Sequence, residues 1–276
     1  MHVMEWGPSD GKTVLLLHGN PTWGFLWRKV VAALRARPSG DALRLVVPDL
    51  IGLGQSSKPT GAAHSIEAHS EWLGAMLDEV APGPLVFAGQ DWGGPIGLHA
   101  LKSRRSRLRG LVIANTAVGP PKPDFKPTMF HRLSQLPIVS DVLFRYLGFP
   151  LQVLHTTQGD KRSIRGEVAR AYRWPLAKRA DREAPLALAR MVPNSQTHVS
   201  VPALRDVEEM FRTAAVPLTI IWGDQDPILG RVVTHLARLR PDANVVHTQA
   251  GHFLQEEVPE PLADAIVDIV ARADWS

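Results

Sequence analysis

The stretch Leu85-Val86-Phe87-Ala88-Gly89-Gln90-Asp91-Trp92-Gly93-Gly94 carries the clearest signal of the fold in this chain. Its first five residues have a strand pattern, and a helical pattern runs from Gly93 to Lys102. Small residues on both sides of Asp91 allow a tight turn that lifts its side chain above the end of a sheet. A carboxylate there could attack a saturated carbon and form an ester. The simpler role for Asp91 would be to cap the following helix.

Strand-like and helical segments alternate on both sides of this stretch. Helical patterns cover residues 23–35 and 65–80, and Ser65 is a candidate N-cap for the second. Apolar runs that are typical of buried strands occupy residues 13–18, 43–49, 111–114, 217–222 and 243–247. Continuous apolar strands separated by helices predict an α/β fold, in which helices flank both faces of a mostly parallel central sheet.

Residues 120–200 interrupt this alternation. The segment begins with Pro120-Pro121-Lys122-Pro123, contains no clear strand and has a mostly helical pattern. We therefore predict a core formed by residues 1–119 and 201–276, into which residues 120–200 are inserted as a helical cap. The cap holds 13 Lys or Arg against 6 Asp or Glu, and a solvated basic surface is the simplest interpretation of that excess.

Composition excludes several classes of function. The 276 residues are 45% hydrophobic and 21% charged, which is ordinary for a globular protein. The absence of Cys excludes disulfides, thiolate metal sites and a Cys nucleophile. The N-terminus lacks the pattern of a signal peptide and no apolar run is long enough for a membrane span, so a cytoplasmic location is expected.

Basic and histidine-containing stretches do not indicate nucleic-acid or metal binding. The basic run from Lys102 to Arg109 has no interleaved aromatic residues, so no nucleic-acid partner is expected. His64 and His69 are five residues apart, as are His247 and His252, which does not fit a helical zinc pair. No loop has a phosphate-binding pattern, and we expect neither a metal nor a cofactor.

Two further residues follow later strands and complete a possible catalytic triad. Asp226 lies in Gly223-Asp224-Gln225-Asp226-Pro227, after the run 217–222, and His252 follows the last predicted strand. A histidine in this place could take a proton from water while an acid orients its other ring nitrogen. Asp224 is the alternative acid, and the position of Pro227 favours Asp226. Nucleophile, acid and histidine then occur in the chain order of one large hydrolase class.

The loop His18-Gly19-Asn20-Pro21 follows the first predicted strand and supplies hydrogen-bond donors. The backbone N–H groups of Asn20 and Trp92 are candidates for an oxyanion hole. Their side-chain N–H groups carry no charge and could hold a departing halide beside Asp91. The simpler roles are packing for Trp92 and turn stabilisation for Asn20.

Together these residues resemble the haloalkane dehalogenases of the α/β-hydrolase superfamily. The resemblance implies that Asp91 displaces halide from a small apolar halogenated substrate and that water activated by His252 hydrolyses the ester. It implies a halide site made of Trp92 and a second donor, either Asn20 or Trp174 of the cap. The matching stretches are 18–23, Pro48-Asp49-Leu50-Ile51-Gly52-Leu53-Gly54, 90–93, Asp226-Pro227-Ile228-Leu229-Gly230 and Gly251-His252-Phe253.

Other interpretations and one departure remain. Epoxide hydrolases use the same nucleophile with cap tyrosines, here Tyr146 and Tyr172, and a β-lactone decarboxylase shares the core. A ligand-binding protein without catalysis would be expected to have lost a triad residue. Relatives carry a longer segment before the first motif, so an edge strand is expected to be missing, and an unpaired edge favours a homo-oligomer.

Overall fold

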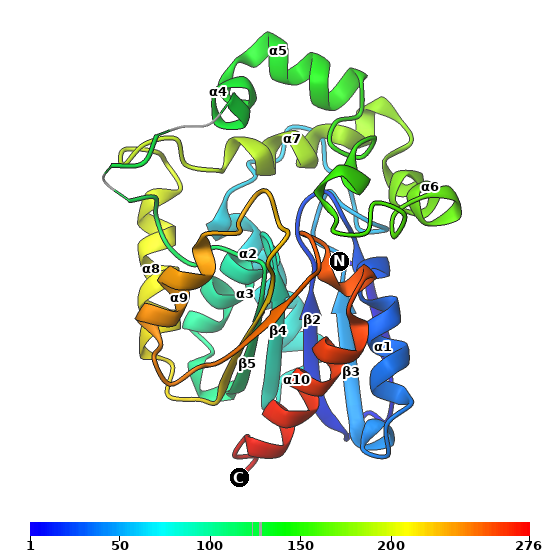
Figure 1. Cartoon of the computed structure of the whole chain (residues 1–276), viewed down its shortest axis with the longest axis vertical. Coiled ribbons are helices and arrows are strands. Elements are labelled where there is room, and N and C mark those ends of the chain that lie inside the picture. Colours follow the sequence, from blue (N-terminus) through cyan, green and yellow to red (C-terminus); the bar gives the residue numbers. More distant parts are fainter. Residues whose placement is uncertain (123, 127–128) are drawn as a thin grey trace.

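The computed structural model describes residues 1–122, 124–126 and 129–276, and these contain a single sheet of seven strands (Figure 1). The strand order across the sheet is β1-β3-β2-β4-β5-β6-β7. The pair β1 and β3 is antiparallel, and all other neighbours are parallel. The strands are β1 (Val3–Trp6), β2 (Lys12–Leu17), β3 (Leu43–Pro48), β4 (Leu85–Gln90), β5 (Leu108–Ala114), β6 (Leu218–Gly223) and β7 (Asn244–Thr248).

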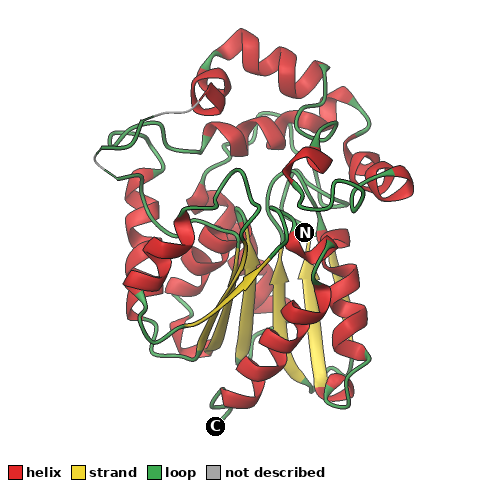
Figure 2. Ribbon diagram, viewed as in Figure 1, coloured by secondary structure: helices red, strands yellow, loops and turns green. Residues whose placement is uncertain are grey.

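The central strands lie between two layers of helices, as the continuous apolar runs predicted. Every residue of β4 and β6 is buried, which requires cover on both faces of the sheet. Helices α1 and α10 pack together, while α2, α3 and α8 form a second packed group on the other side (Figures 1 and 2). The helices around the sheet are α1 (Arg28–Arg35), α2 (Ile66–Val80), α3 (Gly93–Lys102), α8 (Val201–Thr213), α9 (Val232–Leu239) and α10 (Pro259–Arg272).

Local sequence signals set several element boundaries. Helix α3 has the predicted bounds, and Ser65 caps α2 because its hydroxyl accepts a hydrogen bond from the backbone N–H of Ala68 at 3.1 Å. The predicted helix at 23–35 was wrong in its first part: a 3₁₀ turn covers Gly24–Trp27, and the α-helix begins at Arg28. The predicted α/β fold with a mostly parallel sheet is confirmed.

The N-terminal residues form a short strand. Strand β1 forms one edge of the sheet by pairing with β3, with Val3 opposite Pro48. Sequence patterns did not reveal this strand, because four residues are too few to establish a period. Strand β1 therefore covers β3 and is itself an edge strand of the sheet. The missing edge strand and the homo-oligomer both stay predictions.

Between β5 and β6 the chain forms a set of helices beyond the carboxyl ends of the strands (Figure 1). We propose that this region, residues 120–200, is a cap inserted into a core of 1–119 and 201–276. None of the described helices is both long and apolar enough to cross a lipid bilayer. The cap helices are α4 (Met129–Gln135), α5 (Pro137–Asp141), a π-helical turn (Val142–Tyr146), α6 (Gly166–Arg173) and α7 (Glu183–Arg190).

A buried polar cluster fastens α6 to the core. The Tyr172 hydroxyl donates to Glu256 Oε1 at 2.5 Å, and the Arg28 guanidinium binds both oxygens of the same carboxylate, at 2.5 and 2.8 Å. A buried carboxylate needs such partners because unpaired burial of its charge is costly. The indole N–H of Trp23 adds a bond to the carbonyl of Ala171 at 3.2 Å.

Candidate active site

Asp91 occupies a strained turn between β4 and α3. Its φ of +51° lies in the left-handed region, which residues other than glycine rarely adopt. The turn is held by Thr116, whose hydroxyl donates to the Asp91 carbonyl at 2.6 Å. A Cβ added to Gly93 would lie 2.4 Å from the carbonyl oxygen of Leu17, so only glycine lets α3 begin this close to β2. The Asp91 side chain bonds the Asn20 N–H and makes no hydrogen bond to α3, so its simpler predicted role as a helix cap is wrong.

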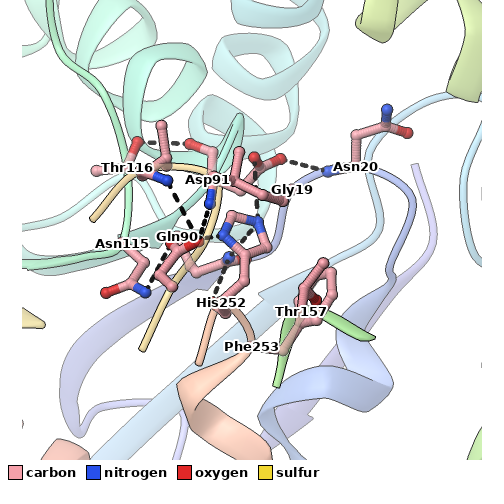
Figure 3. A network of polar contacts seen from close by, with 12 residues as sticks. Gly19, Asn20, Gln90, Asp91, Asn115, Thr116, Thr157, His252 and Phe253 are labelled. Atoms are coloured by element: carbon pink, nitrogen blue, oxygen red, sulfur yellow. Dashed lines mark hydrogen bonds and ion pairs between the residues drawn. The ribbon is translucent and has the colours of Figure 1, made fainter. Parts of the chain in front are cut away.

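The Asp91 carboxylate faces a donor on one side and the imidazole of His252 on the other (Figure 3). Oδ1 accepts a hydrogen bond from the backbone N–H of Asn20 at 2.7 Å. Oδ2 lies 3.5 Å from His252 Nε2. The backbone nitrogen of Trp92 borders the same space, since a Cβ added to Gly19 would lie 2.2 Å from Asp91 Oδ1 and 2.6 Å from that nitrogen.

His252 and Asp226 form a buried pair behind Asp91. His252 Nδ1 lies 2.8 Å from Asp226 Oδ2. Burial opposes the imidazolium charge, but the carboxylates of Asp226 and Asp91 outweigh it and raise the pKa of His252 to about 10. Burial also opposes ionisation of Asp226, and the attraction of His252 with two backbone N–H donors still lowers the pKa of that carboxyl. The Asp226 carboxylate therefore remains charged in the neutral pH range.

Asp224, the alternative acid, does not contact His252. Its carboxylate meets His247 Nδ1 at 2.7 Å in a solvent-exposed pair. Asp226 instead points inward, because its Oδ1 accepts the backbone N–H groups of Ile228 and Leu229 at 2.7 and 3.2 Å. The geometry thus favours Asp226 as the partner of His252.

Asn115 is a site residue that sequence reasoning missed. Its side-chain Nδ2 donates to Asp226 Oδ2 at 2.9 Å and to the backbone carbonyl of Gly251 at 3.1 Å. The backbone carbonyl of Asn115 accepts the backbone N–H of Asp91 at 3.0 Å. This one buried residue therefore touches the turns that hold all three candidate triad residues. The sequence offered a weak signal, because Asn115 directly follows strand β5 at the same edge of the sheet.

A cavity of about 520 Å³ opens between this polar group and the cap. Asn20, Asp91, Trp92 and His252 lie on its core side, and Phe144 of the π-helical turn lines it from the cap. Among the residues that the structure describes, no Lys or Arg lines this cavity. Its other lining residues are mostly apolar and include Pro95, Ala117, Phe149, Val153, Leu154, Val192, Leu204 and Ile228.

The two candidates for the second halide donor have different surroundings. Asn20 lines the cavity, and its side-chain Nδ2 donates to the cap carbonyl of Pro185 at 3.1 Å. Trp174 is 63% exposed and does not line the cavity, so the geometry does not fit the alternative that used this residue.

Neither cap tyrosine reaches the cavity. Tyr172 is fully buried against Glu256, and Tyr146 is 55% exposed with the Arg179 guanidinium stacked 4.0 Å from its ring centre. The donors that an epoxide hydrolase would need are therefore displaced from the site. Within the described ranges, no group of three or more His, Cys, Asp or Glu side chains could hold a metal ion.

Fold and site together define a class of protein. Residues 12–259 match the family model of the alpha/beta hydrolase fold, and the chain belongs to that family. It is 31% identical to a haloalkane dehalogenase of Mycobacterium marinum, over 97% of this chain and 87% of that protein. It is also 31% identical to a cis-3-alkyl-4-alkyloxetan-2-one decarboxylase of Xanthomonas campestris, over 99% and 92%. The crystal structure of the haloalkane dehalogenase DbeA from Bradyrhizobium elkani superposes with a TM-score of 0.87 at 26% identity, covering 98% and 93%.

Proposed function

We propose that this protein is a haloalkane dehalogenase, a hydrolase that converts a haloalkane and water into an alcohol, a halide ion and a proton. The observation that carries the proposal is the placement of the Asp91 carboxylate, held by the Asn20 N–H and faced by His252, at the base of a largely apolar cavity. A carboxylate in such a largely apolar cavity can approach an uncharged carbon centre.

In the first step, Asp91 Oδ2 attacks the carbon that bears the halogen. The new C–O bond forms as the carbon–halogen bond breaks, and the halide leaves with the bonding electron pair. Trp92 and Asn20 border the cavity beside the nucleophile and would donate N–H hydrogens to the halide. These donors carry no charge, so they add no second cation beside the Asp91 carboxylate, which already faces the protonated His252.

Ester formation then prepares His252 for the second step. Once Asp91 is an ester, one of the two carboxylates that raise the pKa of His252 has lost its charge. The imidazole can release its proton to solvent and accept one from water as that water attacks the Asp91 carboxyl carbon. The oxyanion forms at Oδ1, next to the Asn20 N–H. The bond from the carboxyl carbon to the alkoxide oxygen then breaks, and the His252 imidazolium gives its proton to that oxygen to form the alcohol. The new carboxyl group of Asp91 loses its own proton, which restores the carboxylate and leaves one proton in excess.

The test is bromide release from 1-bromobutane and 1,2-dibromoethane by the purified protein. We expect steady turnover with the native chain and a loss of roughly 10⁴-fold or more in Asp91→Asn, because the amide is not a nucleophile for this step. Asp224→Asn is the matched control on an exposed carboxylate and should turn over normally. Bromide release that survives in Asp91→Asn would reject the proposal.

A second candidate function is the decarboxylation of a β-lactone with two alkyl chains. It is supported by the match to the oxetanone decarboxylase along nearly the whole chain and by the size and apolar lining of the cavity. Such a lactone would lose CO₂ and leave an alkene, with one C–O and one C–C bond broken and no water added. Alkene formed from a cis-3,4-dialkyl-oxetan-2-one, without bromide release from bromoalkanes, would favour this function.

A further inference from the structure

A short piece of the inserted region lies bonded along the loop that carries His252. We call residues 157–160 the strap and residues 251–257 the histidine loop. The backbone N–H of His252 donates to the carbonyl of Thr157 at 2.9 Å, and Figure 3 shows Thr157 beside His252 and Phe253. The strap thus contacts the backbone of the candidate base itself.

The buried side chain of Gln158 extends this contact by one residue. Its Oε1 accepts the N–H of Phe253 at 2.9 Å, and its Nε2 donates to the carbonyl of Phe253 at 3.1 Å. Nε2 also reaches the hydroxyl of Ser163 at 3.2 Å, so every polar atom of this amide has a partner. Gln158 therefore holds both backbone groups of the residue after His252, as a neighbouring strand would.

Glu257 makes a second bridge between the two segments. Its Oε1 accepts the N–H of Gly251 at 3.3 Å and of Gly159 at 3.2 Å, and its Oε2 accepts the N–H of Asp160 at 2.9 Å. The histidine loop is consequently bonded to the strap at His252 itself, at Phe253 and at its far end through Glu257.

Close packing prevents the two segments from moving independently. A Cβ added to Gly251 would lie 2.3 Å from the carbonyl oxygen of Thr157 and 2.4 Å from the Cα of Gln158. The two backbones therefore pack with no space for a side chain at Gly251, and the loop cannot move toward the strap unless the strap also moves. The orientation of the imidazole depends on this backbone, because its Nδ1 must stay on Asp226 while Nε2 faces Asp91.

We propose that Gln158 is a positioning residue for His252, and that the strap fixes the histidine loop so that Nε2 can serve the water that attacks the ester. This inference rests on the proposed function, in which only the second step needs His252 as a base. Loss of Gln158 should therefore slow ester hydrolysis and leave ester formation intact.

The test compares Gln158→Met with Gln152→Met. Methionine keeps the length of the side chain but forms none of the three bonds, whereas Gln152 is an exposed cap residue bonded to Arg173. For Gln158→Met with 1-bromobutane we expect one bromide per site in the first turnover at the native rate. Steady turnover should then fall by about 100-fold, a size known for small misplacements of catalytic groups, and the ester should accumulate in the intact-protein mass. Gln152→Met should behave as the native protein.

A second readout does not depend on turnover. The downfield proton resonance of His252 Nδ1–H on Asp226 should shift or broaden in Gln158→Met and stay unchanged in Gln152→Met. Equal losses in both kinetic phases, or an unchanged resonance, would overturn the inference. If the native protein releases no bromide, the proposed function fails while the resonance still tests the strap. If Gln158→Met does not fold, Glu257→Ala breaks the other bridge and should give the same, weaker pattern.

Discussion

At the carboxyl edge of the sheet, polar groups are buried and bonded to one another, whereas the outer helices of the cap leave apolar side chains in solvent. Asn115, Asp226 and His252 are all buried, and each has partners in the core. In the cap, by contrast, Ile138 is 82% and Leu147 62% exposed. A buried polar group is costly unless its geometry is satisfied. The core edge is therefore expected to tolerate few changes, and the outer cap many.

The largest effect should come from His252, whose removal separates the two chemical steps. In His252→Gln we expect one bromide per site and a stable ester on Asp91, with steady turnover lower by roughly 10⁴-fold. Intact-protein mass spectrometry after exposure to 1-bromobutane measures the ester directly. A variant that releases no bromide even in the first turnover would contradict this division of roles.

The pH dependence of turnover by the native protein also tests whether His252 acts only in ester hydrolysis. A raised pKa means that His252 holds its proton in the free protein and can act as a base only after ester formation lowers that pKa. Below the pKa that His252 has in the ester, hydrolysis should slow by about tenfold for each pH unit. Ester formation should not follow this slope, so the ester should accumulate as the pH falls. Rapid-quench mass spectrometry between pH 5 and 9 measures whether the amount of ester rises or falls as the pH is lowered.

A smaller effect is expected from the two neighbouring acids. Asp226→Asn removes the charge that supports the imidazolium and should lower turnover by roughly 10²–10⁴-fold, because the general base loses its orientation. Asp224→Asn lies on the exposed pair with His247 and should stay within about twofold of native turnover, as surface pairs contribute little. Reversal of this order would move the acid role to Asp224.

A smaller difference in effect is expected between substitutions of the two candidate halide donors, one in the core and one in the cap. Asn20→Ala removes an uncharged donor beside Asp91 and should weaken chloride binding by about 10-fold, as expected for one hydrogen bond to a charged group. Trp174→Phe alters an exposed residue outside the cavity and should leave chloride affinity unchanged. The chloride affinity of both variants can be measured through quenching of tryptophan fluorescence. The fluorescence of Trp174→Phe without chloride serves as its own reference. Equal chloride affinity in Asn20→Ala and the native chain would remove Asn20 from the site.

The smallest effect should appear on the outer face of the cap. Ile138→Ser is expected to change the free energy of unfolding by no more than about 0.5 kcal/mol, since the side chain is almost fully exposed. Phe144→Ala on the following π-helical turn removes a buried ring and should cost about 3 kcal/mol. Urea unfolding measures both. A clear loss of stability in Ile138→Ser would mean that this face is covered, and light scattering would then test the predicted homo-oligomer.

Much of the core was predictable because its signals are local. Apolar runs located β2 to β7 within a few residues, and the glycines around Asp91 indicated a turn whose positive φ the structure contains. Chain order placed Asp226 and His252 after strands β6 and β7. Parallel strands end at one edge of a sheet, so residues that follow them were expected to meet there.

Tertiary structure alone decided what depends on residues far apart in the chain. Three such features leave no periodic trace in the sequence: the pairing of β1 with β3, the bonds of Asn115 to the turns of the candidate triad, and the contact of Gln158 with Phe253. The same is true of the surroundings of the two candidate halide donors, since Asn20 is bonded to the cap carbonyl of Pro185 while Trp174 is exposed. The sequence by itself determined which groups could react, because a side chain's chemistry is local. The fold decided which of them face one cavity, because that depends on long-range packing and on the partners that buried polar groups require.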